Sequence, residues 1–345
     1  GSTMKKWTKG VLTGIFAVCA AVVPVCAQEN LVDMVPAGEG KTLSYLTGEP
    51  VQGDIRRRPV AVMMGNNKAG APQSGISSAG VIYEAPVEGN MTRLMGIFEN
   101  YEAIPKIGSV RSCRDYYTSY ANEFEAIYAH FGQAVYAIPY LENIDNLNGL
   151  QLEGSVYFRT EDRKAPHNAY TSGERLLQGI EEKGYSQVYS ENYINNNGHY
   201  LFAQAPSETL LESGIPANTV ALDNYTDNHP WFEYNSETKE YERNQYGEPQ
   251  IDLETGQQLT CDNIILQNSQ YVPYDENGYL NIFCTGEGEG TFITRGKAIP
   301  IKWAYEEEHG ITHYYDENGQ EIRLNPGKTW VEIILNGTED AVSIQ

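Results

Sequence analysis

The sequence lacks the short motifs around which most nucleotide-binding and hydrolytic sites are built. Its 345 residues contain no glycine-rich phosphate loop, no dinucleotide-binding fingerprint, no His-Glu-x-x-His pair and no Gly-x-Ser-x-Gly elbow. These absences leave the common hydrolase and nucleotide-binding classes without support. We therefore expect no cofactor and no metal site.

Basic residues are also scarce. The chain has 24 lysines and arginines against 46 aspartates and glutamates, which gives a net charge of −22. So acidic a chain is unsuited to nucleic acid, and we expect no direct nucleic-acid partner. The imbalance is local, because residues 56–175 hold 12 basic and 13 acidic side chains whereas residues 176–345 hold 8 and 28. A site for an anion is therefore expected in the first of these two segments.

The first 27 residues have the pattern of an export signal. Three lysines precede an uncharged apolar run over residues 11–25, and the Val-Cys-Ala sequence at 25–27 supplies small residues for cleavage after Ala27. A membrane-spanning anchor is one alternative, but the run is shorter than the ~20 apolar residues that a spanning helix needs. Lipid attachment at Cys26 is another, with valine an unusual residue before such a cut. We expect a secreted or cell-surface protein that contacts the membrane only through its N-terminus.

Cysteines are few beyond this signal. Cys113, Cys261 and Cys284 are dispersed and form no metal-binding motif. An odd number of cysteines in an exported protein allows one disulfide and one free thiol. Cys261 and Cys284 lie in the same region and are the candidate pair, although the sequence leaves their pairing open.

The length and the local composition predict two domains. About 315 residues are too many for one ordinary core. Residues 28–58 are rich in glycine, proline and small polar residues without a period, which predicts a flexible tether. We expect an α/β domain at residues 59–195 and an acidic β-rich domain at residues 196–345.

Hydrophobic periodicity predicts the elements of both domains. Short apolar runs predict strands at 59–64, 80–85, 91–98 and 126–131, and helical spacing predicts helices at 113–124, 134–144 and 172–183. This mixture indicates an α/β or α+β fold for the first domain. In the second domain, residues 231–243 predict a hairpin, and two Asn-Gly turns at 277–278 and 318–319 suit further tight hairpins.

The first of two arginine motifs is Gly108-Ser-Val-Arg111-Ser112-Cys113-Arg114-Asp115. Ser112 and Asp115 resemble a capping box, which predicts a helix start there with two arginines around it. Cations are poorly placed at a helix N-terminus, so an anion held by Arg111 and Arg114 would relieve the conflict. The alternative is an internal ion-pair network, in which Glu84, Glu88 or Asp115 is the anion.

The second motif is Arg159-Thr-Glu-Asp-Arg163-Lys164-Ala-Pro166-His167-Asn168. Proline fixes the backbone before His167, and Asn168 can donate or accept a hydrogen bond beside it. His167 could be a general acid or base, a donor to a phosphate or carboxylate, or a histidine that only structures its loop.

Two further residues have both a structural and a functional interpretation. His130 ends a predicted strand before Gly132, where a core histidine and a site residue are both common. Cys113 lies between two arginines, which would favour a nucleophilic thiolate, but no histidine neighbours it in the sequence and a buried structural cysteine is the stronger interpretation.

An ordered set of motifs resembles the YerB-like lipoproteins. Along the chain these motifs are Gly70-Ala-Pro-Gln73, Glu88-Gly-Asn-Met-Thr92-Arg93, the Gly108–Arg114 motif, His130-Phe-Gly132, Arg163-Lys-Ala-Pro-His-Asn168, Trp231-Phe-Glu-Tyr, Gly288-Glu-Gly290 and Leu324-Asn-Pro-Gly-Lys-Thr-Trp330. The resemblance spans residue 58 to the end and implies an extracytoplasmic, membrane-associated bacterial protein with two adjoining domains of unknown function. The chain departs from the family pattern at Ser109, at Cys113 and before Cys26. It carries over no catalytic residues.

We therefore expect an exported cell-envelope protein that binds an anionic ligand or partner through its first domain. The predicted ligand-binding residues are Arg93, Arg111, Arg114, Arg159, Arg163, His167 and Asn168, with Glu84, Glu88 and His130 as secondary candidates. One alternative is an envelope-acting hydrolase or transferase in which His167 is the acid or base and the arginines stabilise negative charge. The other is an interaction module whose arginines are paired internally.

Overall fold

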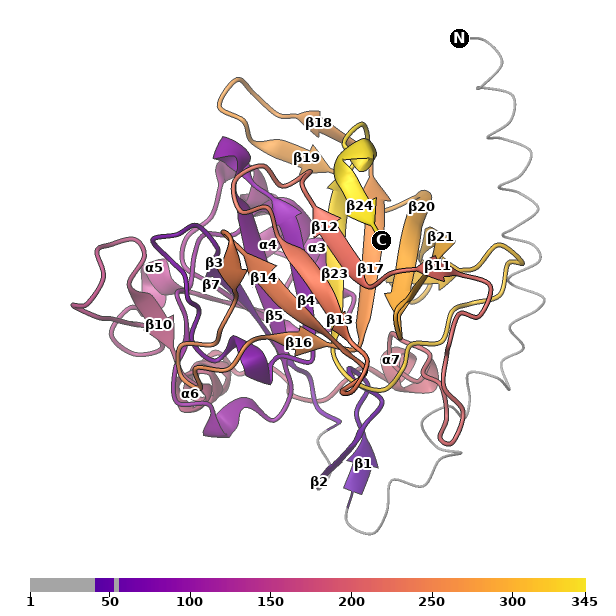
Figure 1. Ribbon diagram of the computed structural model, residues 1–345. Coiled ribbons are helices and arrows are strands. Elements are labelled where there is room, and N and C mark those ends of the chain that lie inside the picture. Colours follow the sequence, from indigo (N-terminus) through magenta and orange to yellow (C-terminus); the bar gives the residue numbers. More distant parts are fainter. Residues whose placement is uncertain (1–40, 53–55) are drawn as a thin grey trace.

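Most of the regular structure is β-sheet, with few helices (Figure 1). The computed structural model describes residues 41–52 and 56–345. The largest sheet in these residues has eleven strands. From one edge to the other they are β11 (Ile215–Pro216), β21 (Lys297–Glu306), β20 (Glu287–Thr294), β17 (Asn263–Ser269), β23 (Thr329–Leu335), β4 (Val81–Pro86), β5 (Thr92–Phe98), β3 (Val60–Gly65), β7 (Ile127–His130) and β8 (Asn146–Asn148), with β22 (Ile311–Tyr315) paired to β21.

A second, six-stranded sheet lies entirely in the C-terminal half. Its order is β15 (Glu248–Pro249), β14 (Glu240–Gln245), β13 (Trp231–Asn235), β12 (Thr219–Leu222) and β24 (Val342–Ile344), with β16 (Thr260–Cys261) paired to β14. A small sheet joins β6 (Ile107–Gly108), β10 (Ala169–Thr171) and β9 (Phe158–Arg159). Two hairpins are β1 (Lys41–Leu43) with β2 (Pro50–Gln52), and β18 (Tyr271–Pro273) with β19 (Leu280–Ile282).

The described α-helices are short. They are α3 (Asp115–Asn122), α4 (Ile138–Leu141), α5 (Gly149–Leu152), α6 (Gly173–Lys183) and α7 (Glu191–Asn195). Single 3₁₀ turns are η1 (Ile76–Ser78), η2 (Glu88–Asn90), η3 (Tyr101–Ala103), η4 (Val135–Ala137) and η5 (Glu339–Ala341). The Ser172 side chain caps α6 by accepting from the Arg175 amide, and Gly184 ends it with a left-handed φ of 69°. Within the described residues no helix is long and apolar enough to cross a membrane.

Alternate residues of the main sheet face two separate cores. Val60 and Val62 pack on one face together with Phe232 of the six-stranded sheet, whereas Ala61 and Met63 pack on the other face. The second face is covered in part by tyrosines of α3. Because successive side chains of a strand point to opposite faces, a strand buried on both faces must be apolar throughout. This is why β3 appears in the sequence as a continuous apolar run, and why β4 and β5 are apolar except at Glu84, Thr92 and Arg93.

The main sheet continues from the first half of the chain into the second. Five strands from the first half and six from the second meet where β4 pairs in parallel with β23, with Glu84 opposite Glu332. Trp330 and Val331 of β23 face opposite cores beside their partners on β4. The boundary that we expected at residue 195 therefore separates two segments of sequence that share one sheet.

Two expectations about the first half of the chain need correction. Residues 41–52, inside the expected tether, form the β1–β2 hairpin because Leu43, Tyr45 and Leu46 are buried; residues 28–40 and Cys26 lie outside the described part. The helix expected at 134–144 is limited to α4 and a 3₁₀ turn.

Cys261 and Cys284 are free and buried. A disulfide between them is prevented because Cys261 belongs to the core on one face of the main sheet and Cys284 to the core on the other.

Candidate functional site

The two arginine motifs meet through the small sheet. Strand β6 belongs to the first motif and pairs with β10, which directly follows the second, so that Gly108 lies opposite Tyr170. The first motif then runs along β3, where the Arg111 amide donates to the Met63 carbonyl at 3.0 Å. Arg93 comes from the neighbouring strand β5. This pairing brings together cationic side chains that are far apart in the sequence.

Arg111 and His167 are in direct contact. The Arg111 Nη1 atom lies 2.9 Å from His167 Nδ1, and both side chains are half-buried. A guanidinium can only donate hydrogen bonds, so His167 Nδ1 accepts and the ring proton is assigned to Nε2. The imidazole is thus held as a neutral group whose remaining nitrogen is a donor.

Positive charge is concentrated around this contact. Burial, together with the charges of Arg114 and Arg111, lowers the pKa of Arg93 to about 10. Burial and the Arg114 charge likewise lower the pKa of Arg111. The pKa of His167 is lowered by burial and then by Arg111, Arg163 and Arg93. A nearby negative charge would stabilise the two arginine cations, and the lowered pKa of His167 agrees with its neutral form.

One carboxylate, Glu88, lies within this group and is bound to Arg114. Arg114 Nε donates to Glu88 Oε2 at 2.9 Å, its Nη2 forms a second, short contact with Glu88 Oε1, and its Nη1 donates to the Cys113 carbonyl at 2.9 Å. Although burial acts in the opposite direction, the Arg114 hydrogen bond and charge lower the pKa of Glu88. Arg114 is therefore paired internally, as the structural alternative requires.

The partners of Arg93 and Arg163 are neutral. Arg93 Nη1 donates to the Ser112 carbonyl at 2.6 Å. Arg163 donates to the carbonyls of Gly70 and Pro72 and to the Tyr170 hydroxyl, each at 3.0 Å. These hydrogen bonds fix the guanidinium groups without neutralising their charge.

Arg159 and Asn168 form a separate contact at the exposed side of the loop. Arg159 Nε donates to Glu153 at 2.8 Å, and its Nη1 donates to Asn168 Oδ1 at 2.9 Å. Asn168 in turn donates to the Thr160 carbonyl at 2.7 Å. Both residues therefore structure the loop that carries His167.

The helix start needs correction. Helix α3 begins at Asp115, with Arg114 and not Ser112 at the N-cap position and without a side-chain cap. The preceding residues are extended, because Cys113 forms a β-bridge with Gln133. Asp115 accepts from the Tyr274 hydroxyl at 2.7 Å. Arg111 therefore lies outside the helix, and burial followed by the Arg114 charge accounts for its lowered pKa.

Glu84 belongs to a different, fully buried network. Its carboxylate accepts from Arg243 Nη2 at 2.8 Å, from Thr92 at 2.7 Å and from Asn228 at 3.0 Å. Arg243 Nη1 also donates to Glu332 at 3.0 Å. Arg243 was absent from our sequence candidates, because a single arginine in a strand gives no local signal of such a partner.

His130 and Cys113 are core residues. His130 is buried, with Nδ1 at 2.7 Å from the Gly132 carbonyl and Nε2 at 2.9 Å from Asn146 Oδ1. Burial raises the pKa of Cys113 to about 12, which disfavours the thiolate that a nucleophile requires. The structural interpretation is favoured for both residues.

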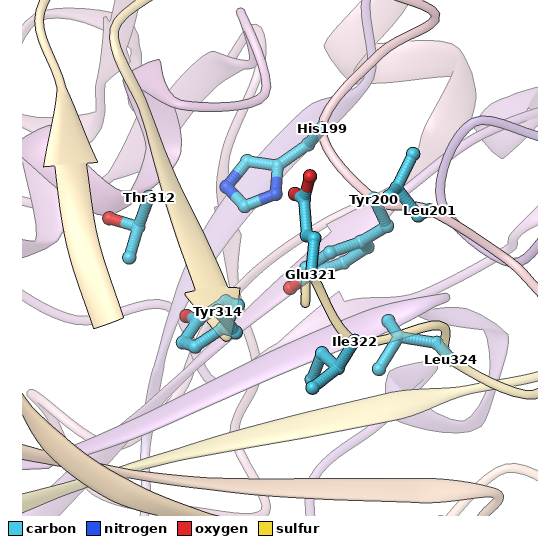
Figure 2. A pocket seen from close by; sticks show the side chains of 8 residues that line it. All are labelled: His199, Tyr200, Leu201, Thr312, Tyr314, Glu321, Ile322 and Leu324. Atoms are coloured by element: carbon cyan, nitrogen blue, oxygen red, sulfur yellow. The ribbon is translucent and has the colours of Figure 1, made fainter. Parts of the chain in front are cut away.

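The sequence analysis also missed histidines of the second half. A cavity of about 10 Å³ is lined by His199, Glu321 and Thr312, among other residues. Figure 2 shows the side chains that line it. His199 Nε2 contacts the buried Glu123 at 3.0 Å. The cavity is far smaller than the roughly 300–1,000 Å³ of sites for organic ligands. For the other histidines of the second half, the sequence did contain a signal, namely the run Glu306-Glu307-Glu308-His309 followed by His313.

Comparisons with known proteins agree with this architecture. Residues 46–186 match the family described as "Protein of unknown function (DUF3048) N-terminal domain", and residues 220–331 match its C-terminal domain. The chain is 31% identical over 345 residues to "Putative lipoprotein YerB" of Bacillus subtilis (strain 168), covering 99% of this chain and 98% of that protein. The crystal structure of the Bacillus subtilis YerB protein superposes with a TM-score of 0.77 at 30% identity, covering 88% of this chain and 99% of that one. The resemblance to the YerB-like lipoproteins is thus confirmed, and the chain belongs to the DUF3048 family.

Proposed function

We propose that this protein is an exported component of the cell envelope that binds a carboxylate- or phosphate-bearing envelope polymer through Arg93, Arg111, Arg163 and His167. The name of the Bacillus relative, "Putative lipoprotein YerB", and the export-signal pattern of the first 27 residues support the location. The remaining predicted residues, Arg114, Arg159 and Asn168, act by holding this group in place.

The contact between Arg111 and His167 carries the proposal. In this contact a cation donates to a neutral imidazole, with Arg93 and Arg163 nearby. Glu88, the carboxylate of the group, is already bound to Arg114. An arriving carboxylate or phosphate would accept from guanidinium groups that now donate to neutral atoms, and it would relieve the repulsion among the arginines.

The hydrogen-bond pattern of His167 favours binding over base catalysis. A general base needs an unprotonated nitrogen facing the substrate. In His167 that nitrogen is Nδ1, and it accepts from Arg111. The free Nε2–H suits donation to an anion.

Calorimetry with purified wall fragments and one matched pair of variants tests this function. The probes are muropeptides with free carboxylates, a phosphate-containing wall polymer, an acidic peptide and an uncharged glucan. Arg111→Gln removes one donor and one charge, whereas Arg323→Gln makes the same change at an exposed residue outside the group. A hydrogen bond to a charged group contributes about 1.5–3 kcal/mol, so Arg111→Gln should weaken binding roughly 10- to 150-fold.

Three results would contradict the proposal. The first is that neither the muropeptides nor the phosphate-containing polymer binds. The second is that the uncharged glucan binds as tightly as these anionic probes. The third is that Arg111→Gln and Arg323→Gln lose the same affinity. Mass spectrometry of the same mixtures distinguishes the enzyme hypothesis: a cleaved or transferred product that disappears with His167→Ala would replace binding by catalysis. Affinity only for an acidic peptide would indicate a protein partner.

A further inference from the structure

A cluster of histidine and glutamate side chains lies on the β21–β22 hairpin. In the main sheet β21 lies toward the opposite edge from β3 and β5 (Figure 1). Strand β21 ends at Glu306, and the turn at 307–310 leads into β22. The Gly310 amide donates to the Glu306 carbonyl at 2.9 Å, and Asn192 of α7 donates to the Glu308 carbonyl at 3.3 Å. The backbone of this turn is therefore held from both sides.

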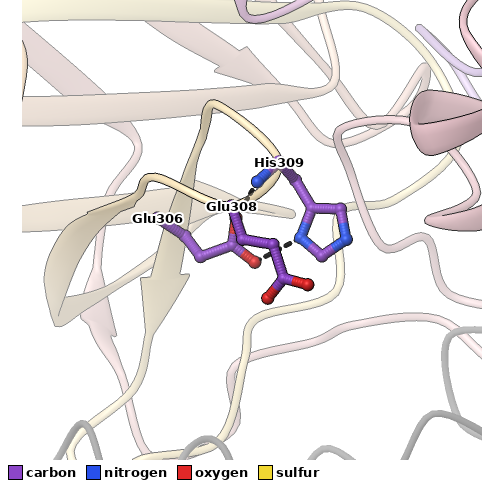
Figure 3. Close-up of side chains that lie close together, drawn as sticks. All are labelled: Glu306, Glu308 and His309. Carbon is purple, nitrogen blue, oxygen red and sulfur yellow. Dashed lines mark hydrogen bonds and ion pairs between the residues drawn. The ribbon is translucent and has the colours of Figure 1, made fainter.

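Three side chains of this turn converge, as Figure 3 shows. One ligand atom each from Glu306, Glu308 and His309 lies within 4.8 Å of the other two. The Glu306 carboxylate accepts from the His309 amide at 2.6 Å and also contacts His309 Nδ1. Glu308 is exposed, so its side chain can rotate toward the other two.

His313 extends the cluster and is oriented from behind. Its Nδ1 lies 2.6 Å from Glu321 Oε1, while its Nε2 lies 4.0 Å from Glu306 Oε1. On the hairpin His313 pairs with Ala304, which makes Glu306 its diagonal neighbour on the same face. A carboxylate that accepts from one ring nitrogen and leaves the other toward a ligand set is the usual support of a metal-binding histidine.

We propose that Glu306, Glu308, His309 and His313 form a binding site for a divalent transition metal of the zinc type. Bonds of about 2.0–2.2 Å place neighbouring ligands of a tetrahedral zinc ion roughly 3.4 Å apart. The ligand atoms of Glu306, Glu308 and His309 lie within 4.8 Å of one another and His313 Nε2 lies 4.0 Å from Glu306, so side-chain rotations would have to bring these groups closer. Imidazole ligands favour zinc, copper or nickel over magnesium and calcium, which prefer oxygen.

The local charge favours a cation. Glu306, Glu307 and Glu308 are consecutive, and Glu321 lies behind His313. With neutral histidines these four carboxylates leave a net charge of −4 before any metal binds. A divalent ion would halve this charge.

Competition with a chromophoric chelator, using the full chain and Zn²⁺, measures the site directly. We expect one zinc ion per chain, and the d–d absorption of tetrahedral Co²⁺ when cobalt replaces zinc. His309→Ala and Glu306→Gln should each weaken binding at least tenfold. Glu321→Gln, which keeps every ligand, should weaken it about 10- to 100-fold.

His229→Ala is the matched control, because His229 is an exposed histidine paired with Asp223 at 3.1 Å. Its affinity for zinc should equal that of the unaltered protein. Thermal unfolding of each metal-free variant checks the fold, and Glu308→Gln changes an exposed side chain if His309→Ala does not fold. Absence of stoichiometric binding would overturn the site, as would equal affinity in His229→Ala and His309→Ala, or binding of Ca²⁺ as tight as that of Zn²⁺.

Discussion

The buried contact of Arg243 with two glutamates gives a prediction about stability and pH. Arg243 donates to Glu84 at 2.8 Å and to Glu332 at 3.0 Å, and all three side chains are fully buried. Burial and the charge of Glu84 raise the pKa of Glu332 well above its ordinary value. One guanidinium cannot neutralise two carboxylates, so we expect Glu332 to keep its proton in the folded protein.

Glu332→Gln should therefore stabilise the protein increasingly as the pH rises. The unfolded chain releases the Glu332 proton near pH ~4.3, whereas the folded chain keeps it up to the raised pKa. Between these two pKa values the wild type loses about 1.4 kcal/mol of unfolding free energy per pH unit, and glutamine has no such loss. Below about pH 4 both states hold the proton and this contribution vanishes. The amide also keeps an oxygen that accepts from Arg243.

Urea unfolding at about pH 4, 5, 6 and 7 measures the difference between Glu332→Gln and the wild type. Glu84→Gln is the contrasting variant, since it removes the carboxylate that accepts from Thr92, Asn228 and Arg243. Breaking a buried pair in this way costs about 3–5 kcal/mol. The reasoning is refuted if Glu332→Gln destabilises by the same amount at every pH, or if its advantage shrinks as the pH rises.

Two further predictions concern buried groups. Burial raises the pKa of Cys113 and of Cys284 to about 12. Neither thiol should therefore react with Ellman's reagent until guanidinium unfolds the chain. Rapid reaction in the native state would contradict their burial. A Cβ at Gly327, where φ is 134°, would lie 1.8 Å from Asp262 Oδ2, so Gly327→Ala should cost about 2 kcal/mol or more of unfolding free energy. Gly337 also has a positive φ, but a Cβ there would meet open space, so Gly337→Ala should cost less unfolding free energy in thermal unfolding of both variants. If the two variants lose the same unfolding free energy, the backbone conformation and not the clash with Asp262 causes the loss.

The sequence predicted the elements whose signals are local. Strand β3 was recognisable because burial on both faces makes it apolar throughout. Helix α6 was recognisable from the helical spacing of its apolar residues. The start of α3 was wrong, because the residues before Asp115 are extended and Cys113 forms a bridge with Gln133. Tertiary pairing overrode a favourable local pattern there.

In the candidate site, too, the sequence predicted which residues take part but not which of them contact one another. The sequence could identify Arg111 and His167 as parts of charged motifs, but their contact depends on the register of β6 against β10. It could not separate Arg114, which Glu88 neutralises, from Arg163, whose partners are neutral. Such differences depend on atoms brought together by folding.

The parallel pairing of β4 with β23 also sets an order of events during synthesis. Strand β4 is complete at residue 86, but its neighbour on that side ends at residue 335. The ribosome must therefore make nearly the whole chain before β23 can pair with β4 in the middle of the sheet. Until then β4 presents an unpaired edge and apolar side chains on both faces, the features through which nascent chains associate wrongly. A chain cut between its two halves would keep that exposed edge permanently.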